Sequence, residues 1–273
     1  MSAALRISLR GYDASIIAAY RRLFPGNADV TQELLDWRFR NNPHGTGKFA
    51  IAEREGLANG IIALLPTKLR NVVGDHTLGY QAIDTCVHPS ARGEGLFVKM
   101  GSLAEDPSAL GGDVLWGFPN ANAAPGWYRR LGWTNFGEVP LLMRPLRSSF
   151  IFGRVHPKLA AVDIRMVGKA APVGDIFLRG SELAGAFDRL WQRVSANFGI
   201  AVDRSGSWMR WRLFDRPEGG YRSVGMKAGG ELQAFVSTKI ADKHDSRLCY
   251  GVWHSAGKLA SGAAPRLGRG AAR

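Results

Sequence analysis

The chain has 273 residues, of which 45% are apolar and 22% are charged, the composition of a soluble globular protein. No apolar run approaches the roughly 18 residues that cross a bilayer, and the first residues lack the apolar core of a signal peptide. We therefore expect a cytoplasmic protein without membrane contacts. The two cysteines and six histidines lack metal-ligand or disulfide spacing, so no metal site is expected.

The net charge of +13 raises the question of nucleic-acid binding. The basic residues are spread along the chain, and the one local excess lies in the Ala/Gly-rich stretch 255–273, which we expect to be disordered. Nucleic acid is therefore not the expected partner. A basic surface also suits a polyanionic small ligand.

The first half of the chain reads as alternating helices and strands. A helix is predicted around SIIAAYRRLF and another, containing Trp37, over 31–40. The remaining predictions in chain order are strands 48–53, 60–66 and 78–87, a helix over 95–105, a strand over 113–118, a short helix over 124–131 and a strand over 138–145. This alternation predicts an α/β fold in which helices flank a sheet.

The pattern W-R-x4-P-x-G occurs twice, from Trp37 to Gly45 and from Trp211 to Gly219. Each copy follows a helix-like segment and precedes strand-like alternation, which indicates a tandem duplication. The most economical role for both tryptophans is to pack the core of each copy. The second copy ends early, so we expect domains at 1–148 and 173–254, a linker over 149–172 and a tail over 255–273, with 1–148 able to fold alone.

The segment from His88 to Phe97, HPSARGEGLF, is called the glycine loop below. It joins a predicted strand to the helix over 95–105, whose first N–H groups and positive dipole end attract anions. Glycines let a backbone approach an anion closely, and Arg92 adds a permanent cation. These features predict a phosphate or pyrophosphate site, with a simple turn before a helix as the alternative. The loop fits neither a Walker loop nor a dinucleotide fingerprint.

The glycine loop resembles the acetyl-CoA-binding motif of the GCN5-related N-acetyltransferase (GNAT) superfamily, Arg/Gln-x-x-Gly-x-Gly/Ala after a V-x-P strand end. Arg92 and Gly95 match its first two places, and Phe97 replaces the last glycine or alanine. The segment GWYRRLGW, from Gly126 to Trp133, resembles the family's F-Y-x-x-x-G-F segment. The chain thus resembles a tandem GNAT protein with an incomplete second unit. This implies a mixed, mostly antiparallel sheet flanked by helices, followed by a partial second copy.

The resemblance implies acetyl-CoA or another acyl-CoA as co-substrate and an N-acyltransferase activity on a primary amine of a small molecule. The implied cofactor-binding residues are Cys86, Val87, Arg92, Gly93, Glu94, Gly95, Leu96, Phe97 and Asn122. Tyr128 matches the position whose tyrosine protonates the leaving thiolate, with aromatic packing as its alternative role.

The general base stays open between two residues near the end of one strand. Asp84, Cys86 and His88 are expected to alternate onto one face of the strand, so Asp84 or His88 can take a proton directly or through water. Nothing in the sequence indicates that Cys86 acts as a nucleophile.

Two further function classes compete with this one. An acyl carrier protein, which is acidic, can supply the acyl group in place of acyl-CoA, and the basic charge of the chain suits such a partner. A non-catalytic module that binds acyl-CoA is the other class. The incomplete second copy is compatible with an oligomer. The sequence does not name the acceptor.

Overall fold

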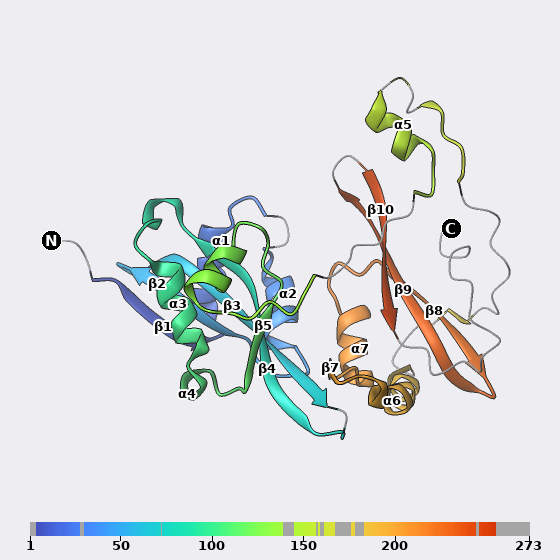
Figure 1. Ribbon diagram of the computed structural model, residues 1–273, viewed down its shortest axis with the longest axis horizontal. Helices are drawn as coiled ribbons and strands as arrows, with labels where there is room; N and C mark the ends of the chain where they lie inside the picture. The colour runs from blue at the N-terminus through green and yellow to red at the C-terminus, as the bar shows by residue number, and fades with distance from the viewer. Residues whose placement is uncertain are drawn as a thin grey trace. The chain divides into compact units, whose positions relative to one another are not determined.

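The computed structural model of the chain describes residues 4–27, 30–71, 73–138, 145–156, 158, 161–166, 176–177, 183–243 and 246–254. Contacts between residues divide the chain into two compact units, of which the first comprises 1–136 and 195–219 and the second 137–194 and 220–273 (Figure 1). The first unit therefore includes a segment from the second copy of the repeated motif. The predicted strand over 138–145 and the tail over 255–273 lie largely or wholly outside the described residues.

The first unit begins with a sheet covered on both faces. Its elements are β1 (Arg6–Gly11), α1 (Ala14–Leu23), α2 (Gln32–Leu35), η1 (Asp36–Arg40), β2 (Lys48–Arg54), β3 (Leu57–Asn71), β4 (His76–Val87), η2 (Pro89–Ala91), α3 (Leu96–Glu105), α4 (Pro107–Leu110), β5 (Val114–Gly117) and η3 (Gly126–Arg130). It continues, after the second unit's segment, with η5 (Ser195–Asn197), β7 (Ile200–Val202) and α7 (Gly206–Leu213).

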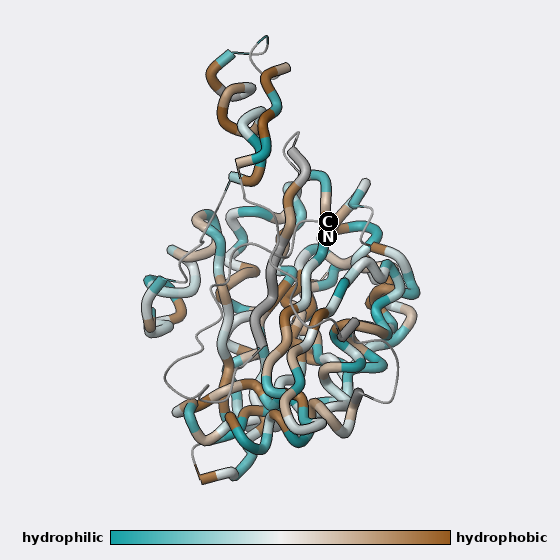
Figure 2. Tube along the Cα trace, turned by 90° about the vertical axis from the view of Figure 1, so that its right-hand side faces the viewer, coloured by the Kyte–Doolittle hydropathy of each residue, from teal (hydrophilic) through white to brown (hydrophobic). Residues whose placement is uncertain are grey.

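The sheet order is β1-β2-β3-β4-β5, antiparallel except for the parallel pair β4–β5, and β7 pairs with the end of β3. Strand β3 contains an apolar run, IIALL, that is buried from Ile61 to Leu64 because helices cover both faces. Figure 2 colours the chain by hydropathy, with the apolar stretches in brown. Ile61 and Ala63 pack under α1, whereas Ile62 and Leu64 pack under α3. None of the helices in the described ranges combines the length and apolar character that a bilayer crossing needs.

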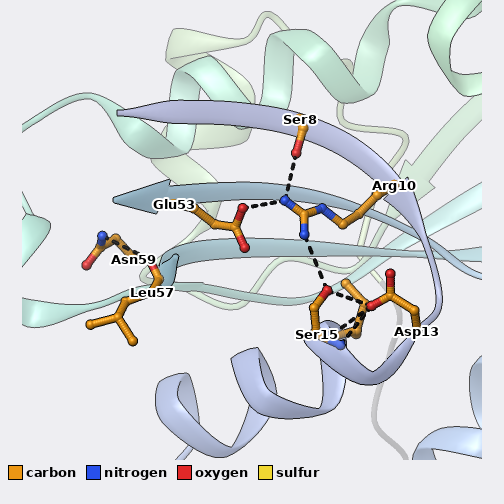
Figure 3. A network of polar contacts seen from close by, with 8 residues as sticks. Ser8, Arg10, Asp13, Ser15, Glu53, Leu57 and Asn59 are labelled. Atoms are coloured by element: carbon orange, nitrogen blue, oxygen red, sulfur yellow. Dashed lines mark hydrogen bonds and ion pairs between the residues drawn. The ribbon is translucent and has the colours of Figure 1, made fainter. Parts of the chain in front are cut away.

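A polar network fixes the amino-terminal edge of this sheet. Arg10 on β1 forms an ion pair with Glu53 on β2 and donates to the hydroxyl of Ser15 at 3.3 Å (Figure 3). Asp13 caps α1 by accepting from the backbone N–H groups of Ser15 and Ile16. The predicted first helix therefore begins directly after its capping residue, Asp13.

The two motif tryptophans pack against each other inside the first unit. The indole rings of Trp37 and Trp211 stack at 4.8 Å, and each indole Nε1 donates to the other residue's backbone oxygen, at 2.9 and 2.8 Å. Both side chains are 5% exposed. The sequence interpretation, in which each tryptophan packs a separate core, is therefore wrong: one core buries both.

The second unit contains α5 (Ser149–Val155), β6 (Ile176–Phe177), α6 (Leu183–Val194), β8 (Tyr221–Ala228), β9 (Glu231–Lys243) and β10 (Ser246–His254). Its sheet has the order β10-β9-β8-β6 and is antiparallel throughout the described pairs. On this sheet, Phe187 of α6 packs against Phe235 of β9 with ring centroids 4.6 Å apart.

The hairpins β2–β3 and β8–β9 have the same register at an offset of 174 residues, the separation of the two tryptophans. Phe49 pairs with Ala63 in the first sheet, and Ser223 pairs with Ser237 at the equivalent place in the second. The register shift after Ala52 recurs after Met226. The hairpin equivalence thus extends through a bulge.

Candidate functional site

Strands β4 and β5 run side by side for only part of their length. Their parallel pairing begins at Gly79–Val114 and ends at Ala82–Gly117. Strand β4 then continues to Val87 without a described partner on that edge, which leaves a gap in the strand pairing. This gap is called the β4–β5 opening below. The glycine loop follows directly at the end of β4 (Figure 1).

A bulge lies in β4 where the opening begins. Ile61 pairs with Cys86 and Ala63 pairs with Ile83, so Asp84 and Thr85 share one position opposite Ile62. Asp84 has a φ of 46°, the left-handed region that a non-glycine residue seldom adopts. The bulge interrupts the predicted regular alternation at Asp84, yet Asp84 and Cys86 still lie on the side of the sheet that α1 covers.

The carboxylate of Asp84 is held by two donors. The hydroxyl of Tyr20 donates to Asp84 Oδ2 at 2.9 Å, and Arg38 Nη1 forms an ion pair with the same oxygen at 2.7 Å. Burial raises the pKa of Tyr20 well above its usual value, and the nearby charge of Asp84 adds to this. Asp84 is thus fixed by a neutral phenol and a cation, two partners that the sequence analysis missed. The only sequence signal was the position of Arg38 in the repeated motif.

Cys86 and His88 also have local partners. The thiol of Cys86 donates to the carbonyl oxygen of Leu23 at 3.5 Å, and burial raises its pKa, which disfavours the thiolate. Nδ1 of His88 lies 2.7 Å from the hydroxyl of Ser90 and accepts from the Ser90 backbone N–H. His88 is therefore the capping residue of η2, with its ring oriented by Ser90.

The glycine loop ends in an uncapped helix. Gly93 and Gly95 have φ values of 88° and 73°, which glycine adopts without strain. Gly95 is the N-cap residue of α3 and no side chain caps this helix. The first bond within the helix joins the Lys99 N–H to the Gly95 carbonyl at 3.1 Å. The N–H groups of residues 96–98 consequently have no partner inside the helix.

Two charged side chains, Glu94 and Arg92, lie beside the N-terminus of α3 in the sequence, and only Glu94 is paired with another described residue. Glu94 forms an ion pair with Arg54 at 2.7 Å, and the hydrogen bond from Arg54 lowers the pKa of the Glu94 carboxyl group. Its charge is therefore balanced by a cation from β2. Arg92 is exposed, and no hydrogen bond or ion pair joins it to the described residues. The loop thus presents one uncompensated guanidinium near free backbone N–H groups, an arrangement that can hold an anion.

Phe97 stands where the motif discussed above has glycine or alanine, and the structure shows how its ring is accommodated. The Phe97 ring lies edge-on to Trp127, with centroids 5.0 Å apart. A Cβ atom at Gly126 would lie only 2.6 Å from this ring. Phe97 therefore packs into the space above Gly126 instead of lying over the loop, and the glycine of the aromatic segment makes room for it.

Tyr128 and Asn122 both follow β5 in the sequence. Tyr128, in η3, packs partly into the core under α3, which also contains Val87, Leu96 and Phe97. Its hydroxyl group makes no hydrogen bond with the described residues. Asn122 is exposed, and its N–H donates to the side chain of Asn120 at 3.1 Å.

The predicted site residues thus lie on two opposite faces of the sheet. Tyr128, Val87, Leu96 and Phe97 share the core under α3, whereas Cys86 packs against the core under α1 and Asp84 bonds to α1 and η1. The β4–β5 opening lies between the two faces.

Comparison with known proteins gives a structural match and no sequence match. No protein-family model and no curated protein matches the chain. A protein of Enterococcus faecalis V583, described as a probable N-acyltransferase, aligns over 87% of this chain with 13% identity and a TM-score of 0.54. The alignment covers 55% of that protein, so this chain spans about half its length.

Lower similarity is found with two other structures. Saccharomyces cerevisiae N-myristoyltransferase with bound myristoyl-CoA aligns over 90% of this chain and 60% of its own, with 10% identity and a TM-score of 0.49. Glucosamine-6-phosphate N-acetyltransferase from Arabidopsis thaliana aligns over 51% and 98%, with 15% identity and a TM-score of 0.39. The likeness to the Enterococcus protein confirms the predicted fold class, a mixed, mostly antiparallel sheet flanked by helices.

Proposed function

We propose that the chain is an N-acyltransferase that moves an acetyl or other acyl group from acyl-CoA to a primary amine of a small molecule. One observation carries this proposal: the same strand, β4, borders an opening in the sheet and leads through the glycine loop into an uncapped helix. A thioester donor with a long arm and a pyrophosphate needs both features. The fold shared with the probable N-acyltransferase supports the proposal.

In this proposal the donor's pantetheine arm lies in the β4–β5 opening and bonds to the backbone of Cys86 and Val87. The pyrophosphate is bound by backbone N–H groups from Gly93 to Phe97, with Glu94 and Leu96 contributing through their main chain. Arg92 adds charge, and the exposed Asn122 contacts the arm. The positive end of the α3 dipole favours the anion further.

Acyl transfer to an amine requires three events at the thioester. The amine loses a proton, its nitrogen attacks the thioester carbon through a tetrahedral oxyanion, and the C–S bond breaks as the thiolate is protonated. We assign the last proton to the Tyr128 hydroxyl, which makes no hydrogen bond with the described residues. We assign the base to His88, directly or through water, because the carboxylate of Asp84 is already engaged through Oδ2 by Tyr20 and Arg38.

The engagement of Asp84 also gives some support to a second candidate, a module that binds acyl-CoA without catalysis. The net charge of +13 supports a third, in which an acidic acyl carrier protein delivers the acyl group. We further propose that 173–254 is an incomplete second GNAT-like copy, supported by the shared register of β2–β3 and β8–β9.

The proposed donor site is tested by calorimetry with acetyl-CoA on the full chain. Gly95→Trp places a bulky group at the α3 N-terminus and is expected to weaken binding at least about 100-fold. Gly26→Trp is a matched control, since Gly26 has a φ of 74° against 73° at Gly95 and no atom lies within 4 Å of either added Cβ. A folded wild-type chain that does not bind acetyl-CoA would exclude the CoA-dependent proposals and leave the carrier protein to be tested.

Catalysis is tested by the release of CoA thiol during an acceptor screen. Tyr128→Phe keeps the ring in the core and removes the hydroxyl group. We expect kcat to fall about 100-fold with acetyl-CoA affinity unchanged, the size typical of a lost general acid. Binding without thiol release for any amine would favour the non-catalytic module.

A further inference from the structure

An apolar strip runs along β5 beside the β4–β5 opening. Val114, Trp116 and Phe118 occupy alternate positions, and the rings of Trp116 and Phe118 meet edge-to-face at 5.5 Å. These three residues are called the β5 strip. Val114 is 37% exposed and Phe118 is 66% exposed. Large apolar side chains are seldom left exposed together without a role in binding.

The β5 strip lies on the face of the sheet opposite α3. Leu115 packs into the core under α3, and a Cβ atom at Gly117 would lie 3.7 Å from Trp133 of the same core. Side chains alternate along a strand, so Val114 and Trp116 of β5 face the other way, toward the α1 side, and the ring of Phe118, just after β5, contacts that of Trp116. The described core under α1 contains no residue of β5. On this face the strip is therefore outside the core that α1 covers.

The polar groups next to the β5 strip carry little net charge. Gln81 pairs with Trp116 in register, so its amide lies on the same face. Asp84, just beyond, is neutralised by its ion pair with Arg38. An amide and a balanced ion pair do not select a polycation. They leave apolar contact and stacking as the main source of affinity at this edge of the opening.

We infer that the β5 strip is the acceptor subsite, and that the acceptor is a monoamine carried by an apolar, preferably aromatic, body. The inference rests on the proposed function, because the strip borders the opening in which the thioester would lie. An aromatic body packed against the exposed ring of Phe118 places its amine toward the end of the strand pairing at Ala82–Gly117. Amino sugars and polyamines, which lack such a body, are then poor acceptors.

The small size of the β5 strip favours a small ligand over a protein partner. Its two rings meet edge-to-face, with centroids 5.5 Å apart, and so form one compact apolar surface. The indole Nε1 of Trp116 is buried and has no hydrogen-bond partner among the described residues, so the apolar side chains dominate this surface. The strip can therefore supply apolar and edge-to-face aromatic contact.

The inference is tested by titrating the full chain with 2-naphthylethylamine and with ethanolamine, and following binding by calorimetry. The wild type is expected to bind the naphthyl amine at least about tenfold more tightly. Phe118→Ala should remove most of this preference, and Phe118→Tyr should restore it. Ile200→Ala is the control, since Ile200 is an exposed apolar residue on β7, which pairs with β3 and not with β5.

Activity provides the second readout. Phe118→Ala should raise the KM for the naphthyl amine about tenfold and leave the KM for acetyl-CoA unchanged. Thiol release with polar amines and no preference for apolar ones would overturn the inference while retaining the proposed function. Binding of the naphthyl amine without acetyl-CoA binding would support the β5 strip and exclude the CoA-dependent transferase.

A stability measurement tests whether another part of the chain covers the β5 strip. Because Phe118 is mostly exposed, Phe118→Ala should leave the melting temperature nearly unchanged. A large fall would show that another part of the chain buries the ring, and it would overturn the inference.

Discussion

The hairpins β2–β3 and β8–β9 have the same register, yet their central residues differ in chemistry. Phe49 and Ala63 pair in the first, and both lie in the core under α1. The equivalent Ser223 and Ser237 are also buried and bond to each other at 2.7 Å. The comparison teaches that strand pairing tolerates a change from apolar packing to a hydroxyl pair when both hydroxyls are satisfied.

The strands that follow the two hairpins differ more. Strand β4 continues past a bulge and into the glycine loop and α3, whereas the described part of the second unit ends with β10 at His254. The second copy's helix α7 packs in the first unit through Trp211. The features that we propose for acyl-CoA binding thus belong to the first unit, and residues 195–219 contribute to that unit's core.

The largest expected effect comes from removing the second copy's contribution. A chain of residues 1–148 lacks α7, and it leaves Leu34 and Trp37 without Trp211. We expect it not to unfold cooperatively, in contrast to the expectation from sequence, because a buried core is opened. Urea unfolding followed by circular dichroism measures this. A sharp transition like that of the whole chain would show that the tryptophan core is dispensable.

A single substitution gives the next largest effect. Trp211→Ala removes a stacked ring and leaves the indole N–H of Trp37 in a cavity, which should cost about 4 kcal/mol of unfolding free energy. Trp208→Ala is the comparison, because Trp208 only borders the same core. Equal losses for the two variants would contradict a special role for the reciprocal hydrogen bonds.

The middle residue of the first P-x-G segment, His44, predicts a pH effect on stability. His44 has both ring nitrogens buried without a hydrogen-bond partner among the described residues, and burial lowers its pKa to about 4. Its equivalent in the second motif, Glu218, pairs with Arg216 at 2.6 Å. The first motif therefore holds a neutral imidazole where the second holds a charged pair.

The sign of the pH effect follows from the lowered pKa of His44. The unfolded chain binds the proton near pH 6.5 and the folded chain only near pH 4, so stability is complete above pH 6.5 and declines as the pH falls toward 4. The loss is at most about 3 kcal/mol. Unfolding of the wild type and of His44→Phe at several pH values measures it, and parallel pH profiles would refute the assignment.

The smallest effect concerns the paired serines. Ser237→Ala leaves the buried hydroxyl of Ser223 without its partner and should cost about 1–2 kcal/mol. Replacing both serines by alanine should restore most of the loss, as in the first hairpin, which has no hydroxyl at these places. A double-mutant cycle on unfolding free energies tests this, and simple additivity would contradict it.

The helices and strands of the first unit were largely predictable because their apolar periodicity is strong. The predicted strands 48–53, 60–66 and 78–87 correspond to β2, β3 and β4, and the helix after the glycine loop is α3. The predicted helix over 31–40 divides into α2 and the π-helical η1, in which Asn41 N–H donates to Asp36 O. Strand ends were less accurate, as is usual for sequence-based prediction.

The surroundings of the candidate site were less predictable, because they depend on contacts between distant residues. The bulge at Asp84 has no local signal, since neither glycine nor proline marks it. The partners Tyr20 and Arg38 lie 64 and 46 residues away from Asp84 in the sequence. The packing of Phe97 on Gly126 likewise joins two segments that periodicity treats separately. The roles of these residues in binding and catalysis stay predictions.

The interlocked tryptophans also set the order in which the protein can mature during synthesis. The amino-terminal sheet leaves the ribosome well before Trp211 is made, so Trp37 has no stacking partner until that residue emerges. During this interval Leu34 and Trp37 are expected to leave an apolar surface exposed, to which a chaperone can bind. Translation speed between β5 and α7 therefore becomes a determinant of yield, and slow codons in this interval should increase aggregation in the cell.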